Sequence, residues 1–220
     1  MSAFHPRLEV LTAPADIEAA GFLAADTMRH TPSYVEIYRG EEEWRVAQLR
    51  HLFPNFIRLK VVCGKDSVRL ARDEGGAVVC SFMFAKSTDK KPSFWNKVQV
   101  GILEIPFRAN LSSFKRLIQT DHWHTQHLME LVGDRPHYFV NMMVVAPAAQ
   151  GKGVGTACLK QALKEADDEN MPVILSTNSE INVRFYSKLY GQSEYPADDP
   201  KYAYQNWTMI REPIKEGTKE

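Results

Sequence analysis

The chain has 220 residues, 44% of them hydrophobic and 25% charged, which is the composition of one ordinary globular domain with a continuous core. Its 27 basic residues balance its 27 acidic residues, so no overall charge favours binding to nucleic acid or to an anionic membrane. We therefore expect recognition through a local site, with no nucleic-acid partner and no membrane attachment.

The cysteines and the N-terminal segment both favour a cytoplasmic location. Cys63, Cys80 and Cys158 show no C-x-x-C spacing, which argues against a disulfide framework and against a structural zinc site. Residues 1–11 contain no apolar run behind a basic segment, and no stretch of the chain is apolar for the length of a membrane span. The sequence predicts a soluble, cytoplasmic protein.

The first part of the chain is predicted to hold a short strand and two helices. Residues 7–12 alternate weakly between apolar and polar, and Pro14 then opens an alanine-rich helix that should run to about Arg29. A second helix is predicted over residues 41–62, where Pro54 should kink it. We expect the first helix to cover one face of a sheet.

A hairpin and a helical stretch follow. Residues 66–72 and 77–85 predict two antiparallel strands, because a Glu-Gly-Gly turn separates them. The next polar segment gives way to a helical stretch that should break near Pro106 and restart with Ser112 or Ser113 as its N-cap.

From residue 138 onward, strands and helices alternate. The apolar run 138–145 is short, lacks breakers and stops at Pro147, which predicts a central strand buried on both faces. A glycine-rich turn and a helix over about 153–170 follow. The later predicted elements are a strand at 173–176, a helix capped by Asn178 or Ser179 that runs to Leu189, and closing strands at 192–195 and 205–211.

The turn Gln150-Gly151-Lys152-Gly153-Val154-Gly155 is a candidate anion site. Backbone N–H groups converge at the N-terminus of the following helix, where the helix dipole also favours negative charge. Glycines carry no Cβ, so a pyrophosphate can approach the main chain closely, and Lys152 and Thr156 can add donors. The spacing matches neither the Walker A sequence nor the dinucleotide-binding fingerprint.

Together with a second segment, this turn resembles a known family. The pattern Val145-x-Pro147-x-x-Gln150-Gly151-x-Gly153-x-Gly155 is similar to the acetyl-coenzyme A signature of GNAT acetyltransferases. Further on, Asn182-Val183-Arg184-Phe185-Tyr186 looks like the family's Asn-x-x-Phe-Tyr segment, at the expected order and distance. The resemblance covers about residues 137–212, and it is strongest to the puromycin N-acetyltransferase-like branch.

The resemblance implies a fold, a co-substrate and a set of site residues. The fold is GNAT-like α/β, with a mixed, largely antiparallel central sheet splayed around residues 138–145 and flanked by helices on both faces. Acetyl-coenzyme A is the implied co-substrate, and no metal is implied. The residues implied to bind it are Met143, Val144 and Val145 along the pantetheine arm, Gln150, Gly151, Lys152, Gly153, Val154, Gly155 and Thr156 at the pyrophosphate, and Asn182 and Tyr186 near the thiol end.

The two catalytic roles differ in how well the residues support them. Tyr186 is implied as the general acid, because the departing thiolate needs a proton or a hydrogen-bond donor. No comparable base is evident, since Ser176 stands where this branch often has an acidic residue and the strand 138–145 carries no carboxylate. Glu104 is a tentative base, because burial in its apolar run would raise its pKa towards the working range; the alternative is a residue facing water.

The histidines of the helical stretch offer another source of a base. His122, His124 and His127 could form a proton relay, because imidazole titrates near neutral pH. The commoner explanation is a solvated helix surface. Their spacing with Asp121 spreads the four side chains over different faces of a helix, which argues against a metal site.

These inferences predict one acetyltransferase domain over residues 1–220, with acceptor-side helices in about 1–136 and the acetyl-coenzyme A-binding core in about 137–212. It should transfer acetyl to a primary amine of a small molecule by direct attack in a ternary complex, because neither motif holds a cysteine. Alternatives are a protein lysine or N-terminal acetyltransferase and a non-catalytic acyl-coenzyme A-sensing domain; the protein is expected to be a monomer or homodimer. Six aromatic residues suggest an apolar or aromatic acceptor, namely Tyr34, Tyr38, Phe94, Trp95, Phe107 and Trp123.

Overall fold

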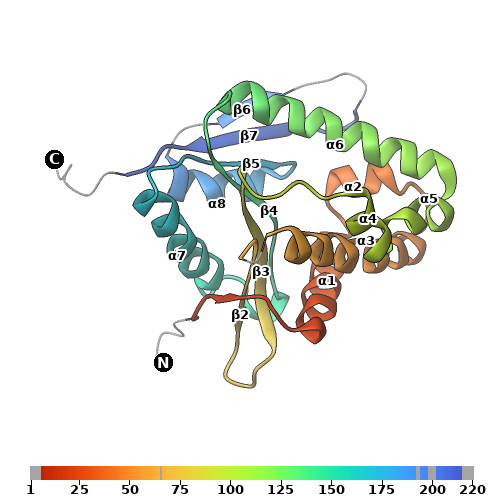
Figure 1. Ribbon diagram of the computed structural model, residues 1–220, viewed down its shortest axis with the longest axis horizontal. Helices are drawn as coiled ribbons and strands as arrows, with labels where there is room; N and C mark the ends of the chain where they lie inside the picture. The colour runs from red at the N-terminus through yellow and green to blue at the C-terminus, as the bar shows by residue number, and fades with distance from the viewer. Residues whose placement is uncertain (1–5, 65, 192–193, 198–201, 215–220) are drawn as a thin grey trace.

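A seven-stranded mixed sheet organises the molecule (Figure 1). The computed structural model describes residues 6–64, 66–191, 194–197 and 202–214. The strand order is β1-β2-β3-β4-β5-β7-β6, and every neighbouring pair is antiparallel except β4 with β5. The strands are β1 (Glu9–Val10), β2 (Val68–Arg72), β3 (Val78–Lys86), β4 (Tyr138–Val145), β5 (Val173–Thr177), β6 (Glu194–Ala197) and β7 (Asn206–Arg211). The predicted sheet is therefore confirmed, with β4 at its centre.

Helices cover both faces of this sheet. α7 and α8 pack on one face, α1 and α3 pack on the other, and α6 crosses over β5 and β7 (Figure 1). The helices are α1 (Pro14–Met28), α2 (Pro32–Ile37), α3 (Glu42–Cys63), α4 (Phe94–Gln99), α5 (Ile105–Arg108), α6 (Asn110–Val132), α7 (Val154–Asp168) and α8 (Glu180–Tyr190), with 3-10 turns η1 (Ile102–Glu104) and η2 (Pro147–Ala149). Among the described residues, no helix combines the length and the apolar character needed to cross a membrane.

The N-terminal helices and the hairpin confirm most of the sequence predictions. α1 and α3 begin and end within a residue of the predicted bounds, and Pro54 lies inside α3 without ending it. A Cβ on Gly21 would lie 2.5 Å from the Pro54 ring, so glycine is what lets α1 approach α3 at this point. The short helix α2 carries no periodic pattern long enough to predict, and the sequence did not indicate it.

The predicted start of the longest helix is wrong. α6 begins at Asn110, and the Asn110 side-chain oxygen accepts a hydrogen bond of 2.9 Å from the Ser113 N–H. Asn110 has a φ of 49°, a left-handed conformation that asparagine tolerates better than most residues. Ala109 is at the N-cap position and Asn110 makes the side-chain hydrogen bond of the first turn, so neither Ser112 nor Ser113 serves as the cap.

The second half of the chain follows the predicted order. β5, α8 and β7 lie where the sequence placed them, and α8 has Ser179 at its N-cap position. β6 pairs with β7, while residues 192–193 of the predicted strand lie outside the described residues. β4 departs from expectation, because its side chains alternate between buried and more exposed positions along the strand.

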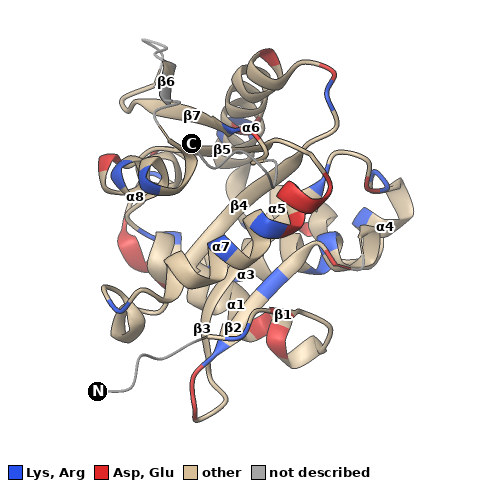
Figure 2. Ribbon diagram, turned by 90° about the vertical axis from the view of Figure 1, so that its left-hand side faces the viewer, with Lys and Arg blue, Asp and Glu red and all other residues tan. Residues whose placement is uncertain are grey.

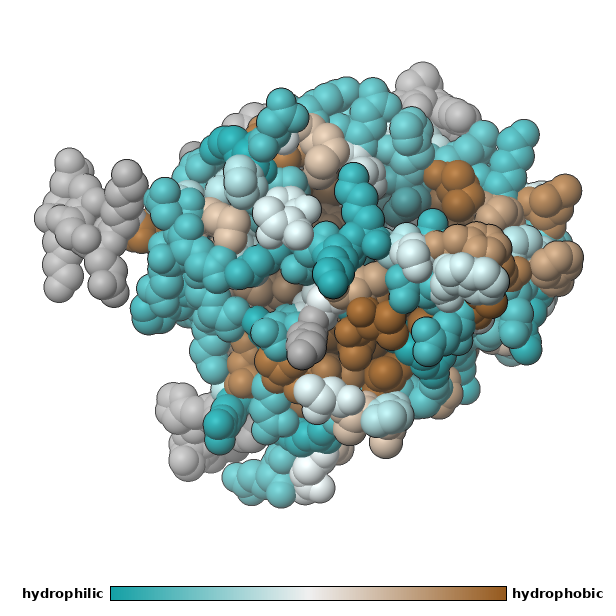
Figure 3. Space-filling model, viewed as in Figure 1, coloured by the Kyte–Doolittle hydropathy of each residue, from teal (hydrophilic) through white to brown (hydrophobic). Residues whose placement is uncertain are grey.

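The surface matches the balanced composition. In Figure 2, Lys and Arg are interspersed with Asp and Glu over the helices and strands. Figure 3 shows apolar side chains at the end of the molecule that α5 and the start of α6 form, where Phe107 and Leu111 are 89% and 77% exposed.

Candidate active site

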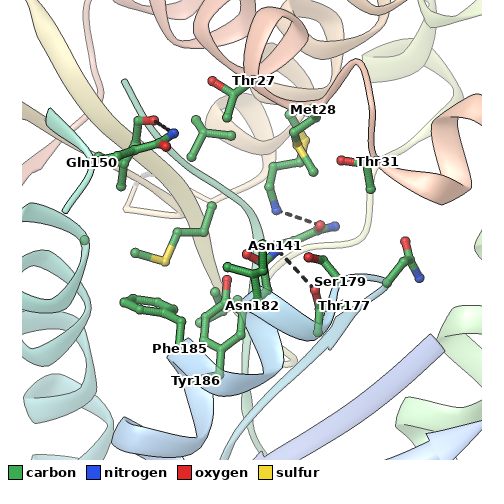
Figure 4. Close-up of a pocket in the computed structure, with 18 of the residues that line it drawn as sticks. Thr27, Met28, Thr31, Asn141, Gln150, Thr177, Ser179, Asn182, Phe185 and Tyr186 are labelled. Carbon is green, nitrogen blue, oxygen red and sulfur yellow. Dashed lines mark hydrogen bonds between the residues drawn. The ribbon is translucent and has the colours of Figure 1, made fainter. Parts of the chain in front are cut away.

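A cavity opens where β4 and β5 separate. The two strands pair only at Tyr138 with Val173 and at Phe139 with Ile174, so their carboxyl halves diverge. The divergence leaves a cavity of about 750 Å³, closed by the α1–α2 junction, the start of α7 and the face of α8 (Figure 4). The predicted splaying around residues 138–145 is thus present, and it creates this cavity.

A bulge in β4 lies at the floor of this cavity. β3 pairs Ser81 with Val144 and Met83 with Asn141, so β4 has one extra residue in this interval. Met142 takes a left-handed φ of 51°, and its N–H donates to the Asn141 side-chain oxygen at 2.7 Å. The Asn141 side chain therefore satisfies a backbone donor that the bulge removes from the ladder.

The bulge reverses which face of the sheet each side chain meets. Before it, Tyr138 and Val140 pack into the core under α7 and α8. After it, Met142 and Val144 pack into the core under α1 and α3, while Met143 turns to the α7 side. An extra residue shifts the period-2 alternation by one position, so the even-numbered side chains of β4 face opposite sides of the sheet before and after the bulge.

The turn before α7 has the conformation of an anion cradle. Gly151 and Gly153 have φ values of 72° and 79°, which glycine adopts without strain, and a Cβ on either would meet no atom within 4 Å. The Ala157 N–H donates to the Gly153 carbonyl at 2.9 Å, so the N–H groups of the residues between them have no partner within the helix. These open N–H groups and the space above the glycines fit a pyrophosphate.

Gly155 has a different role from the two glycines before it. A Cβ there would lie 3.1 Å from the Val145 side chain and 3.6 Å from the Phe185 ring. Gly155 therefore lets α7 approach both β4 and α8. The Gln150 amide closes the turn by donating to the Val145 carbonyl at 2.9 Å.

α8 places three predicted residues on the cavity. Asn182 donates to the Thr177 hydroxyl at 3.3 Å, and Phe185 and Tyr186 contact each other edge to face with ring centroids 5.0 Å apart. All three line the cavity, and Figure 4 shows the two rings facing it. Burial, with a smaller contribution from Cys80, raises the pKa of Tyr186, so its phenol stays protonated and can donate.

The opposite wall comes from residues that the sequence did not single out. Thr27, Met28 and Thr31 of the α1–α2 junction face Tyr186 across the cavity in Figure 4. The Thr27 hydroxyl is buried and has no hydrogen-bond partner among the described residues. Asn141 also lines the cavity, and as the one polar residue of an apolar strand it carried a signal in the sequence. The α1–α2 junction carried no such signal in the sequence, because only the packing of α1 brings it to the cavity.

Of the predicted cofactor residues, all but Lys152 line the cavity. Lys152 is exposed on the turn beside it. Glu104 lies elsewhere: it is exposed in η1 and pairs with Arg108 at 3.3 Å, so the burial that made it a tentative base is not present. Its apolar neighbours do not cover it because η1 leaves both Leu103 and Glu104 at the surface.

Most of the six aromatic residues that suggested an aromatic acceptor do not line the cavity. Tyr34 lines the cavity, but Phe94, Trp95 and Phe107 are exposed on α4 and α5. The two others are core residues, because Tyr38 packs under α3 and Trp123 stacks on Tyr202.

Two comparisons with known proteins, one of the sequence and one of the fold, find acetyltransferases. Residues 114–191 match the model of the acetyltransferase (GNAT) family. The whole chain superposes on a protein described as histone acetyltransferase HPA2 and related acetyltransferase from Corynebacterium glutamicum, with a TM-score of 0.60, 15% identity and coverage of 98% of this chain and 100% of that chain.

Two further solved structures share the fold. Arylalkylamine N-acetyltransferase 2 from Aedes aegypti superposes with a TM-score of 0.58, 13% identity and coverage of 96% of this chain and 100% of that chain. A GNAT superfamily phosphinothricin acetyltransferase from Sinorhizobium meliloti, solved in complex with AcCoA, superposes with a TM-score of 0.50, 14% identity and coverage of 98% and 91%. The puromycin N-acetyltransferase-like branch stays a prediction. Residues 114–191 thus match the acetyltransferase (GNAT) family model, and the chain has the GNAT fold.

Proposed function

We propose that this protein is an acetyl-coenzyme A-dependent N-acetyltransferase that acetylates a primary amine of a small molecule. The observation that carries the proposal is the cavity between β4 and β5, onto which the anion cradle, Asn182 and Tyr186 all open. A helix N-terminus that favours negative charge and a protonated phenol lie on one continuous space. This is the arrangement that a long phosphorylated thioester needs.

The residues on one side of the cavity would hold the co-substrate through the main chain. Residues 150–156 offer N–H groups to the pyrophosphate, and Met143 to Val145, beyond the bulge, offer backbone groups that β5 leaves free. Asn182 would contact the pantetheine arm. When bound, acetyl-coenzyme A supplies the activated acetyl group.

Tyr186 would act as the general acid. Its phenol is buried, protonated at neutral pH and directed into the cavity, so it can donate to the sulfur as the thiolate leaves. The acceptor amine would approach from the α1–α2 side and attack directly, since both buried cysteines, Cys80 and Cys158, lie in the core between β3 and α7.

A coupled binding and turnover experiment tests this proposal. Acetyl-coenzyme A binding is measured by calorimetry, and free thiol is then followed with a panel of amines: 2-phenylethylamine, agmatine, spermidine and a lysine-containing peptide. The proposal expects micromolar-range binding and thiol release with at least one small amine. Binding without release for any amine would indicate an acyl-coenzyme A sensor, and release with the peptide alone would indicate a protein acetyltransferase.

A further inference from the structure

His124 lies at the acceptor end of the cavity although it comes from a helix inserted between β3 and β4. α6 packs Leu128 and Val132 against Ile174 of β5 and Ile210 of β7, and it crosses over these strands in Figure 1. This docking carries His124 to the carboxyl end of β5. There it lines the cavity together with Asn178.

Two hydrogen-bonding side chains meet one nitrogen of the His124 ring. The Tyr204 hydroxyl lies 3.2 Å from His124 Nε2, and the Asn178 amide nitrogen lies 3.5 Å from the same atom. Asn178 is itself fixed, because it donates to the buried Asn206 side-chain oxygen at 2.8 Å. Both neighbours offer donors, so Nε2 carries the lone pair and the ring proton is assigned to Nδ1.

Aromatic contacts hold the His124 and Tyr204 side chains in place. Trp123 stacks on Tyr202 with ring centroids 4.3 Å apart and contacts Tyr204 at 5.7 Å. The His124 ring in turn contacts Tyr204 edge to face at 6.0 Å. The segment before β7 is therefore packed against α6, and the position of the imidazole is set by its surroundings.

The surroundings also keep the imidazole neutral. Burial, with a smaller contribution from the nearby His127, lowers the pKa of His124 to about 4. Burial raises the pKa of Tyr204, so its phenol keeps its proton. The titratable groups around His124 and its two partners are His127 and Asp121 on α6, Tyr34 and Glu36 on α2, and Tyr202 and Tyr204 before β7. Glu36 is paired with Arg39.

We infer that His124 accepts the proton of the acceptor amine, with Tyr204 and Asn178 as positioning residues. The inference rests on the proposed acetyltransferase function and names the base that the sequence left open. His124 lines the acceptor end of the cavity, and a neutral imidazole there favours the uncharged amine, which is the form able to attack. A carboxylate in the same place would instead stabilise the unreactive ammonium.

The amine nitrogen forms a bond to the acetyl carbon while the carbon–sulfur bond breaks. One proton passes from the nitrogen to His124 Nε2, and one passes from Tyr186 to the departing sulfur. The Tyr204 hydroxyl turns away from Nε2 as the amine binds, which frees the lone pair, and it then accepts from the protonated ring. Because burial disfavours the imidazolium, His124 releases this proton to solvent, and Tyr186 takes up a proton from solvent, so both side chains return to their starting states.

The first test needs no turnover. Nuclear magnetic resonance of ¹⁵N-histidine-labelled protein, titrated from pH 5 to pH 8, should show His124 neutral throughout with the proton on Nδ1. The exposed His122 on the same helix provides the internal reference signal. A protonated His124 at neutral pH would overturn the inference.

The second test measures the chemical step with the best amine of the panel. Single-turnover rates should fall about 10²-fold or more in His124→Gln, while acetyl-coenzyme A affinity stays within about twofold. In His124→Ala, added imidazole should restore part of the rate in proportion to its free-base concentration, which a structural role would not allow. His122→Gln should match the unmodified protein.

The outcomes separate this inference from the proposed function. If the unmodified protein acetylates an amine and His124→Gln does so equally fast, His124 is not the base and the enzyme assignment stands. If the unmodified protein binds acetyl-coenzyme A but acetylates nothing, the proposed function fails and the inference fails with it. Tyr204→Phe should lower the rate about three- to tenfold, because it removes one hydrogen bond to the ring.

Discussion

The two walls of the cavity are built in different ways. The co-substrate wall comes from β4 at and after the bulge, residues 150–156 and α8, and much of what it offers is main chain at the bulge and at residues 150–156. The acceptor wall is made of side chains from segments far apart in sequence, at residues 27–34, His124 and Asn178. A site built from backbone needs a particular turn conformation, whereas a site built from side chains needs distant elements to dock correctly. Substitutions in the two walls should therefore change different measured quantities.

The largest effect is expected for Tyr186→Phe, because Tyr186 lies between the walls and serves only the chemical step. Turnover should fall about 10²-fold or more, while the Kd for acetyl-coenzyme A changes by less than about twofold. Tyr190→Phe is the matched control: its buried hydroxyl has no hydrogen-bond partner among the described residues, and it lies outside the cavity. Equal losses in both variants would show that the helix, and not the phenol, is what matters.

A smaller effect, confined to the co-substrate wall, is expected for Gly153→Val. A valine at a φ of 79° is strained, and its side chain would enter the space above the cradle. Affinity for acetyl-coenzyme A should weaken about tenfold or more, measured by calorimetry. Gly76→Val in the β2–β3 turn has a φ of 83° and similarly open space, so it should lose similar stability without losing affinity. Unchanged affinity in Gly153→Val would refute the cradle.

The smallest effect should come from moving the acceptor wall with Gly21→Ala. The new Cβ would push α1 away from Pro54 on α3, at a cost of about 1–3 kcal/mol in the free energy of unfolding. Since α1 ends at the cavity, the KM for the amine should rise severalfold while the Kd for acetyl-coenzyme A stays constant. Ala24→Gly in the same helix destabilises by about 1 kcal/mol without this displacement and should leave KM unchanged. A shift in acetyl-coenzyme A affinity would mean that the walls are coupled.

Much of the fold could be predicted because its signals are local. The helices α1, α3 and α7 have long periodic patterns, and the β2–β3 hairpin has a glycine turn, so each appears in the sequence where the structure has it. The start of α6 was missed because an asparagine in a left-handed conformation competes with two serines nearby. Glu104 was misplaced because an apolar neighbourhood in sequence does not ensure burial in a short 3-10 turn.

The co-substrate wall was predicted from the sequence, through the family resemblance that Gly151, Gly153 and Gly155, followed by Asn182 and Tyr186, carry. The physical reason is that a backbone cradle needs only a few glycines and a helix start, which lie next to one another in the chain. Tertiary structure alone decided the acceptor wall. His124, Asn178 and Tyr204 meet only because α6 packs on β5 and β7, and long-range packing of this kind leaves no fixed spacing in the sequence.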